Sequence, residues 1–213
     1  MATNDVAHHF DNAEQQARAV ALGIWVFLAT ELLLFGGLFS AFIVLKVQHT
    51  EVFSEAATHL SLFLGTLNTA ILLTSGLTIF LTEQALHAQR RTLAIGLLAA
   101  TAFLGCAFIG VKGYEWHHEY QQALLPVLDV RFHYPGSAPE VAELFFNFYY
   151  IMTGLHVVHM LVGLGLLAGM GVAVIRWRQP KTLNRRATLI ALYWAFVDII
   201  WVVLFSLLYL QGA

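Results

Sequence analysis

Four ionisable side chains lie within long apolar stretches of this sequence, where an ionisable group is costly and is usually kept for a function. They are one glutamate, two histidines and one aspartate: Glu31, His156, His159 and Asp198. Measured from the centre of its stretch with the helical rise, each lies within roughly 5 Å of the middle. Groups at one depth meet if their helices face one another, so the pattern favours a buried cluster that handles protons or forms hydrogen bonds. The structural alternative is that each side chain only ties two helices together.

Glu31 is the strongest of these candidates. It is the twelfth residue of a 26-residue stretch, 20–45, that holds no other ionisable group. A charge near the centre of a hydrocarbon core costs on the order of 2.5–3.5 kcal/mol. On a helical wheel Glu31 shares its face with bulky residues, whereas Ala29, Gly36 and Ser40 lie on the opposite face, where close helix packing is expected. We therefore expect Glu31 to point away from the tightest contact, toward another subunit or a lipid-filled groove.

The two histidines, in TGLHVVHM, are three residues apart and share one face of a helix. As metal ligands they would need at least one further donor, and a single helix cannot supply both axial ligands of one haem. The other four apolar stretches contain no histidine. Structural or proton-linked histidines are therefore favoured over a metal site.

Asp198 shares a helical face with Trp194 and Trp201, whose indole N–H groups could satisfy a buried carboxylate. Asn68 belongs to a stripe of polar and small residues in the second apolar stretch. We interpret that stripe as a helix-packing feature.

The elements that must position these residues are five apolar stretches, 20–45, 60–81, 93–111, 144–175 and 187–210. Each is long enough for a membrane-spanning helix, and the composition, 59% apolar and 11% charged, is that of an integral membrane protein. The four prolines all fall between the stretches. The sequence therefore predicts an all-α fold, one bundle of five transmembrane helices over 20–213, preceded by a short segment, 1–19.

The orientation follows from the distribution of Lys and Arg, because cytoplasmic loops carry an excess of both. Eight of them fall on the side of the amino terminus and three on the other: Lys46, Lys112 and Arg131. We expect segment 1–19 in the cytoplasm and the carboxyl terminus outside. Net charge is −2, which gives no reason to expect nucleic acid.

Five segments carry a resemblance to subunit III of the haem-copper cytochrome oxidases, and they occur in the family's order over nearly the whole chain. They are ATELLLFGGLFSAF (29–42), LNTAILLTSGLTIFL (67–81), KGYEW (112–116), TGLHVVH (153–159) and YWAFVDIIW (193–201). Glu31 stands at the family's buried glutamate and Glu115 at a family carboxylate. Asn68, Trp194 and Trp201 are the other polar positions of these motifs.

The resemblance implies a function that the composition does not. In that family subunit III holds no haem or copper and packs against the catalytic subunit I. It is thought to support proton uptake into subunit I and to protect the active centre during turnover, and phospholipids bind in a cleft between its helices. The complex, which includes subunit II, reduces oxygen to water with electrons from cytochrome c, or from quinol in sister enzymes.

The chain departs from the family pattern in two ways. Position 195 is Ala where the family usually has His, so any contact made by that imidazole is lost. The chain has five apolar stretches, whereas the mitochondrial form has seven spans, and the amino-terminal pair that forms one wall of the lipid cleft is missing. Five spans point to a bacterial enzyme in the inner membrane.

These observations predict a non-catalytic subunit III of a bacterial cytochrome c oxidase, with no cofactor of its own beyond bound phospholipid. Haem and copper are expected in subunits I and II. One alternative is the same subunit in a quinol oxidase or beside a nitric oxide reductase. A free-standing proton or ion transporter predicts internal repeats or broken helices, and the sequence shows no convincing repeat. A metalloenzyme built on the histidine pair predicts bound metal in the isolated chain.

Overall fold

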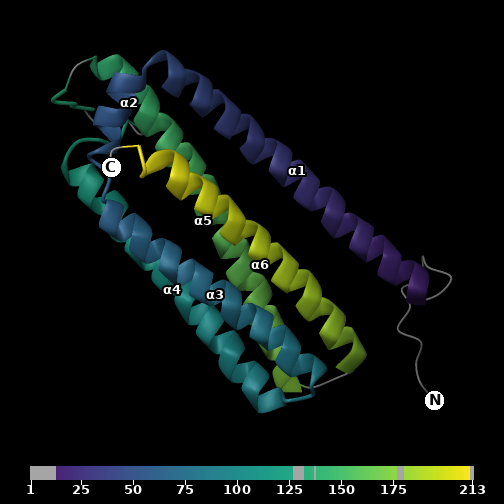
Figure 1. Cartoon of the computed structure of the whole chain (residues 1–213). Coiled ribbons are helices and arrows are strands. Elements are labelled where there is room, and N and C mark those ends of the chain that lie inside the picture. Colours follow the sequence, from purple (N-terminus) through teal and green to yellow (C-terminus); the bar gives the residue numbers. More distant parts are fainter. Residues whose placement is uncertain (1–12, 127–131, 137, 177–179, 212–213) are drawn as a thin grey trace, which may run out of the picture.

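The fold is all-helical in a computed structural model that describes residues 13–126, 132–136, 138–176 and 180–211 (Figure 1). Six helices occur among these residues: α1 (Ala13–Gln48), α2 (Thr50–Ala57), α3 (Leu62–His87), α4 (Arg91–Gln121), α5 (Pro139–Arg176) and α6 (Pro180–Leu208). All except α2 are long and apolar enough to cross a membrane. The predicted fold class and the five spanning helices are therefore confirmed by length and composition.

The helices differ from the predicted stretches at their ends. The short helix α2 is not among the predicted elements, and it buries Phe53, Ala56 and Ala57. Helix α4 continues past residue 111 to Gln121, because its backbone keeps its hydrogen bonds beyond the apolar run. Pro139 and Pro180 begin α5 and α6, where a missing N–H has no cost. Residues 1–12 lie outside the described residues.

Four long helices, α3 to α6, form a bundle in which α3 and α5 each pack on both α4 and α6. Helix α1 contacts α5 and α6 and is the least buried of the five spanning helices. Figure 1 shows α1 at one side of the bundle, and the start of α1 and the end of α6 at opposite ends of the molecule. Five spanning helices produce that arrangement, because the chain changes to the opposite side of the membrane with each helix.

The centre of the bundle is filled by the indole of Trp194, which is fully buried. A Cβ added to Gly163 on α5 would lie 2.9 Å from this ring, and one added to Gly105 on α4 would lie 3.0 Å from it. Trp194 Nε1 donates a hydrogen bond of 2.9 Å to Ser75 Oγ on α3. One side chain of α6 therefore contacts the other three helices of the bundle.

Gly163→Ala tests this packing. An alanine normally stabilises a helix by about 1 kcal/mol relative to glycine, but here the methyl group would overlap a rigid ring and cost about 1–3 kcal/mol. Thermal unfolding of the purified protein in detergent should show a lower midpoint for this variant. Gly165→Ala is the matched control, because its Cβ would meet nothing within 4 Å. Equal or higher midpoints for both variants would contradict the packing.

Candidate functional site

The carboxylate of Glu31 and the imidazole of His159 meet between α1 and α5. Glu31 Oε2 lies 3.0 Å from His159 Nε2, and the two side chains are 16% and 11% exposed. His159 Nδ1 lies 2.8 Å from the carbonyl oxygen of Leu155, so Nδ1 carries a hydrogen and donates it. A second proton must then lie between Oε2 and Nε2, because two lone pairs would repel at this distance. The pair therefore shares one proton, which either atom can carry.

This pair also joins α6. Tyr193 on α6 donates its hydroxyl hydrogen to the carbonyl oxygen of His159 at 2.9 Å. The ring of Phe35 on α1 meets the imidazole edge-on, with centroids 5.4 Å apart. Polar contacts from α1 and α5 thus hold the imidazole in one orientation, and α6 bonds the backbone of the same residue.

The prediction that Glu31 points away from the tightest helix contact is wrong. Its face of α1, with Leu28, Phe35 and Phe42, is the buried face. On the opposite face Ala29 is exposed, and a Cβ on Gly36 would meet nothing within 4 Å. Aromatic side chains fill the space between α1 and the bundle, so burial of apolar area decides this face, not close approach of the backbones.

His156 lies apart from the Glu31–His159 pair, although both histidines are on α5. It is fully buried, with its ring 5.4 Å from that of Phe108 and 5.3 Å from that of Trp201. Neither of its ring nitrogens has a hydrogen-bond partner in the part of the chain that the structure describes. The side-chain amide of Asn68, also fully buried, is likewise without a partner there.

The two tryptophans beside Asp198 do not satisfy its carboxylate, contrary to the prediction. Trp194 donates to Ser75, and Trp201 Nε1 donates to Thr69 Oγ1 at 3.1 Å. Asp198 Oδ1 is buried without a hydrogen-bond partner among the described residues. The other oxygen lies 2.5 Å from the position that a Cβ of residue 76 would take, so Gly76 makes room for the carboxylate. The indoles and the carboxylate all face α3, but the indole N–H groups bond to its hydroxyl groups and not to Asp198.

A larger polar network lies toward the end of the bundle where α4 ends and α5 begins. No network was predicted there from the sequence. We call it the Lys112 cluster; it comprises Lys112, Glu115, Glu119, Tyr149, Tyr150 and Tyr209. Lys112 Nζ donates to Glu115 Oε2 at 2.9 Å, to Tyr149 Oη at 2.8 Å and to Tyr209 Oη at 2.6 Å. The lysine is fully buried, and all three of its N–H groups have acceptors.

The phenols of the cluster donate in turn to its two carboxylates. Tyr149 and Tyr150 donate to Glu119 at 2.7 and 2.8 Å. Tyr209 donates to Glu115 at 2.9 Å. The sequence carries a signal for this arrangement, because Lys112, Glu115 and Glu119 recur at helical spacing on the face that buries Phe108. The hydropathy pattern does not reveal this arrangement, because the charged residues end the apolar stretch at residue 111 and fall outside the predicted helix.

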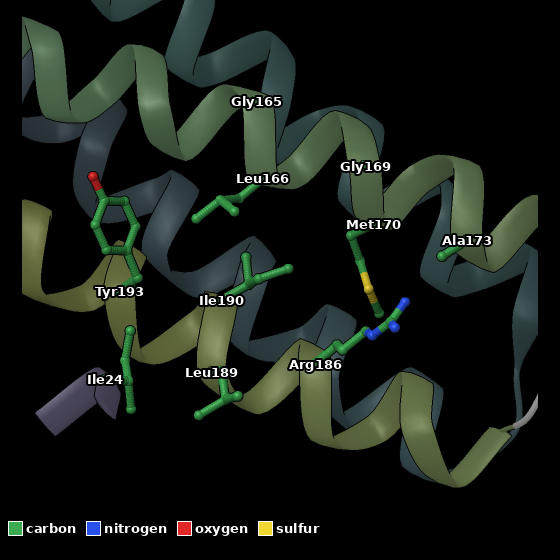
Figure 2. Close-up of a pocket in the computed structure, with 10 residues that line it drawn as sticks. All are labelled: Ile24, Gly165, Leu166, Gly169, Met170, Ala173, Arg186, Leu189, Ile190 and Tyr193. Carbon is green, nitrogen blue, oxygen red and sulfur yellow. The ribbon is translucent and has the colours of Figure 1, made fainter. Parts of the chain in front are cut away.

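A groove lies between α1, α5 and α6, at the end of the bundle opposite the Lys112 cluster. Its volume is about 440 Å³. Figure 2 shows Leu166, Ile190 and Tyr193 around it and the guanidinium of Arg186 at one end. The lining is apolar apart from this cation and the tyrosine, so the groove suits a hydrocarbon chain with an anionic group near Arg186.

Comparison with known proteins decides the family. The sequence profile described as cytochrome c oxidase subunit III matches residues 3–213. The chain belongs to this family. It is 32% identical over 204 residues to cytochrome c oxidase subunit 3 of Thermostichus vulcanus, covering 94% of this chain and 91% of the relative. It is 30% identical over 212 residues to cytochrome bo(3) ubiquinol oxidase subunit 3 of Pseudomonas aeruginosa, covering 99% and 93%.

The chain is thus a subunit III of a haem-copper terminal oxidase, and the surroundings of His156 and His159 do not fit a metal centre. Both ring nitrogens of His159 are engaged, by Leu155 and Glu31. His156 is enclosed by aromatic rings. Among the described residues, no three His, Cys, Asp or Glu side chains lie close enough together to hold a metal ion.

Lys112→Met tests the cluster in this subunit III. It leaves two buried carboxylates without their cation, which costs about 3–5 kcal/mol. We expect a large loss of thermal stability of the purified oxidase, while Lys46→Met, at the end of α1, changes little. The double variant Lys112→Met with Glu115→Leu should be less destabilised than the single one, since it removes both partners. A single variant as stable as the native protein would show that the cluster contributes nothing.

Proposed function

We propose that this chain is the non-catalytic subunit III of a bacterial cytochrome c oxidase, packed against subunit I in the inner membrane. Subunits I and II would hold the haem and copper at which oxygen is reduced. The proposal is supported by the match of the family profile over nearly the whole chain and by the bacterial relatives named above. The role of this chain is to stabilise subunit I and to support proton uptake into it.

The distribution of basic residues supports an orientation with the amino terminus in the cytoplasm. Arg90, Arg91, Arg176 and Arg186 gather at the end of the bundle where α3 and α5 finish. Lys112, which counts against this orientation, is buried in an ion pair. Its removal from the count of loop charges strengthens the asymmetry. Arg131 and Arg178 lie outside the described residues.

The Glu31–His159 pair is the group that we propose to assist proton uptake. It holds one proton between a carboxylate oxygen and an imidazole nitrogen in a site that is neither fully buried nor open. The pair is neutral when it holds this proton. Loss of the proton, or gain of another, changes its net charge by one unit only. His156 and Asp198 have no contact of this type and act in our proposal as buried residues that order the bundle.

Bound phospholipid is the second part of the proposed role. The apolar groove between α1, α5 and α6 accommodates an acyl chain, and Arg186 at its end attracts a phosphate. Since α1 is attached to the bundle by few contacts, a lipid in this groove would support its position.

A quinol oxidase is the second candidate, and a specific observation favours it. The relative from Pseudomonas aeruginosa is a ubiquinol oxidase subunit, and a relative from Staphylococcus haemolyticus at 26% identity is a probable quinol oxidase subunit. The electron donor binds elsewhere in such complexes, so the spectrum and the donor preference of the assembled enzyme separate the two candidates.

Co-purification tests the proposed function. The tagged chain, extracted in a mild detergent, should bring a larger membrane subunit and a haem signal in the reduced-minus-oxidised spectrum. Mass spectrometry of the same preparation should identify subunits I and II and bound phospholipid. Oxygen consumption with cytochrome c and with quinol then identifies the donor. A colourless chain without partners would contradict the proposal and favour a free-standing transporter.

Glu31→Gln tests the proton role. The amide N–H of glutamine can donate to His159 Nε2, but glutamine cannot exchange a proton, so assembly should be intact while turnover slows or decays earlier. Oxygen consumption by the purified complex, followed through prolonged turnover, measures both. Glu51→Gln, an exposed residue of α2, is the matched control. Kinetics of Glu31→Gln that match the control throughout would count against the role.

A further inference from the structure

The Lys112 cluster has one cation for two carboxyl groups. Lys112 donates to Glu115 and to two phenols, and each of the three phenols lies within hydrogen-bond distance of Glu115 or Glu119. With both carboxyl groups ionised, Lys112 balances only one of them, and the cluster carries a net charge of −1.

A net charge in this position is unfavourable, because the three charged side chains of the cluster are buried. Lys112, Glu115 and Glu119 are each at most 2% exposed. Among the described residues, the elements around it do not place a second cation in hydrogen-bond contact with the cluster. The neighbouring side chains from α5 and α6 are Tyr149, Tyr150 and Tyr209, and the buried face of α3 carries no titratable residue. His156 on α5 is near enough to Lys112 to interact with its charge, but its ring is enclosed by Phe108 and Trp201 and makes no hydrogen bond to the cluster. An uncompensated buried charge is costly, so the cluster has a strong tendency to acquire one positive charge.

The surroundings of Glu119 indicate whether the bound cation is a proton or a metal ion. Glu119 lies in the last turn of α4, and its Oε2 accepts from Tyr150, the partly exposed phenol of the cluster. A metal cation would need several oxygen ligands free of hydrogen-bond donors, whereas both oxygens of Glu119 already accept from phenols. A proton needs one lone pair only. The geometry fits a proton and not a metal ion.

We propose that the Lys112 cluster is a proton-binding site that exchanges one proton with the aqueous phase on the outer side of the membrane. The proton binds to Glu119 Oε2. The Tyr150 hydroxyl turns toward water, and the new carboxylic O–H donates to the Tyr150 oxygen. The charge of the cluster changes from −1 to 0, and no bond to carbon forms or breaks. The side of the membrane from which the proton arrives rests on the orientation proposed above. The existence of the site does not.

A buried polar group without a partner lies on the helix that faces the cluster. Asn68 is fully buried, and its amide has no partner among the described residues. It lies on α3 between Gly65, which is packed against Tyr209, and Thr69, which is bonded to Trp201. Lys112 Nζ lies 5.3 Å from the ring centre of Tyr209 and 5.6 Å from that of Trp201. These two rings connect the cluster to this part of α3.

Infrared difference spectroscopy of the intact oxidase tests the site. Buffer exchange from alkaline to acid should produce the carbonyl stretch of one protonated carboxyl group, which Glu119→Gln removes. Glu140→Gln, an exposed carboxylate at the same end of the bundle, should leave the band unchanged. A band that persists in full in Glu119→Gln overturns the proposal.

Tyr150→Phe provides a second variant, in case Glu119→Gln fails to assemble. It should keep the titrating band but shift its frequency, since the acid loses its phenolic acceptor. An unshifted band overturns the assignment to Glu119. A band that responds to sodium at constant pH shows a metal ion in place of the proton and also overturns the proposal.

Oriented vesicles test to which side of the membrane the proton site is open, independently of whether the site exists. An acid pulse in the external medium of right-side-out vesicles should raise the band at once, and one in inside-out vesicles should not. The reverse result would leave the proton site in place and overturn its outward access, together with the orientation under Proposed function.

Discussion

The indole of Trp194 occupies the space that Gly105 and Gly163 leave open in the middle of the bundle, and its N–H group donates to Ser75 on α3. Water cannot satisfy backbone or side-chain polar groups within a bilayer, and lipid provides little hydrophobic force between helices. Close packing around a large flat ring therefore has to fix how α3 to α6 meet. The positions of His156, Asp198 and the Lys112 cluster all follow from that fit.

Helix α1 depends on a different kind of contact. Its buried face consists of bulky side chains, and one polar pair, Glu31 with His159, joins it to α5. The four-helix bundle is thus held by shape, whereas α1 is held by apolar area and by one shared proton. A helix attached in this way is the part of the fold that responds most readily to a neighbouring subunit or lipid.

The spanning helices and the family could be predicted from the sequence, because hydropathy and ordered motifs are local properties. The partners of the buried polar residues could not. Depth places Glu31 and His159 at one level, but it does not give the rotation of α1 that makes them meet. A helical wheel places Trp194 and Trp201 beside Asp198, yet their N–H groups find Ser75 and Thr69, which lie far away in sequence. From the sequence, Lys112 is counted as a charge in a loop. Only the structure shows that Tyr149 and Tyr209 bond to it inside the bundle.

Helix α6 follows the other five helices in the chain, and it supplies both the Trp194 ring and the Tyr209 hydroxyl. Before it inserts, Lys112 and Glu115 lack one of their partners, and Gly105 and Gly163 lack the ring that packs against them. The four earlier spanning helices thus satisfy the requirement of hydropathy, while charged groups among them still have an unmet partner in the membrane.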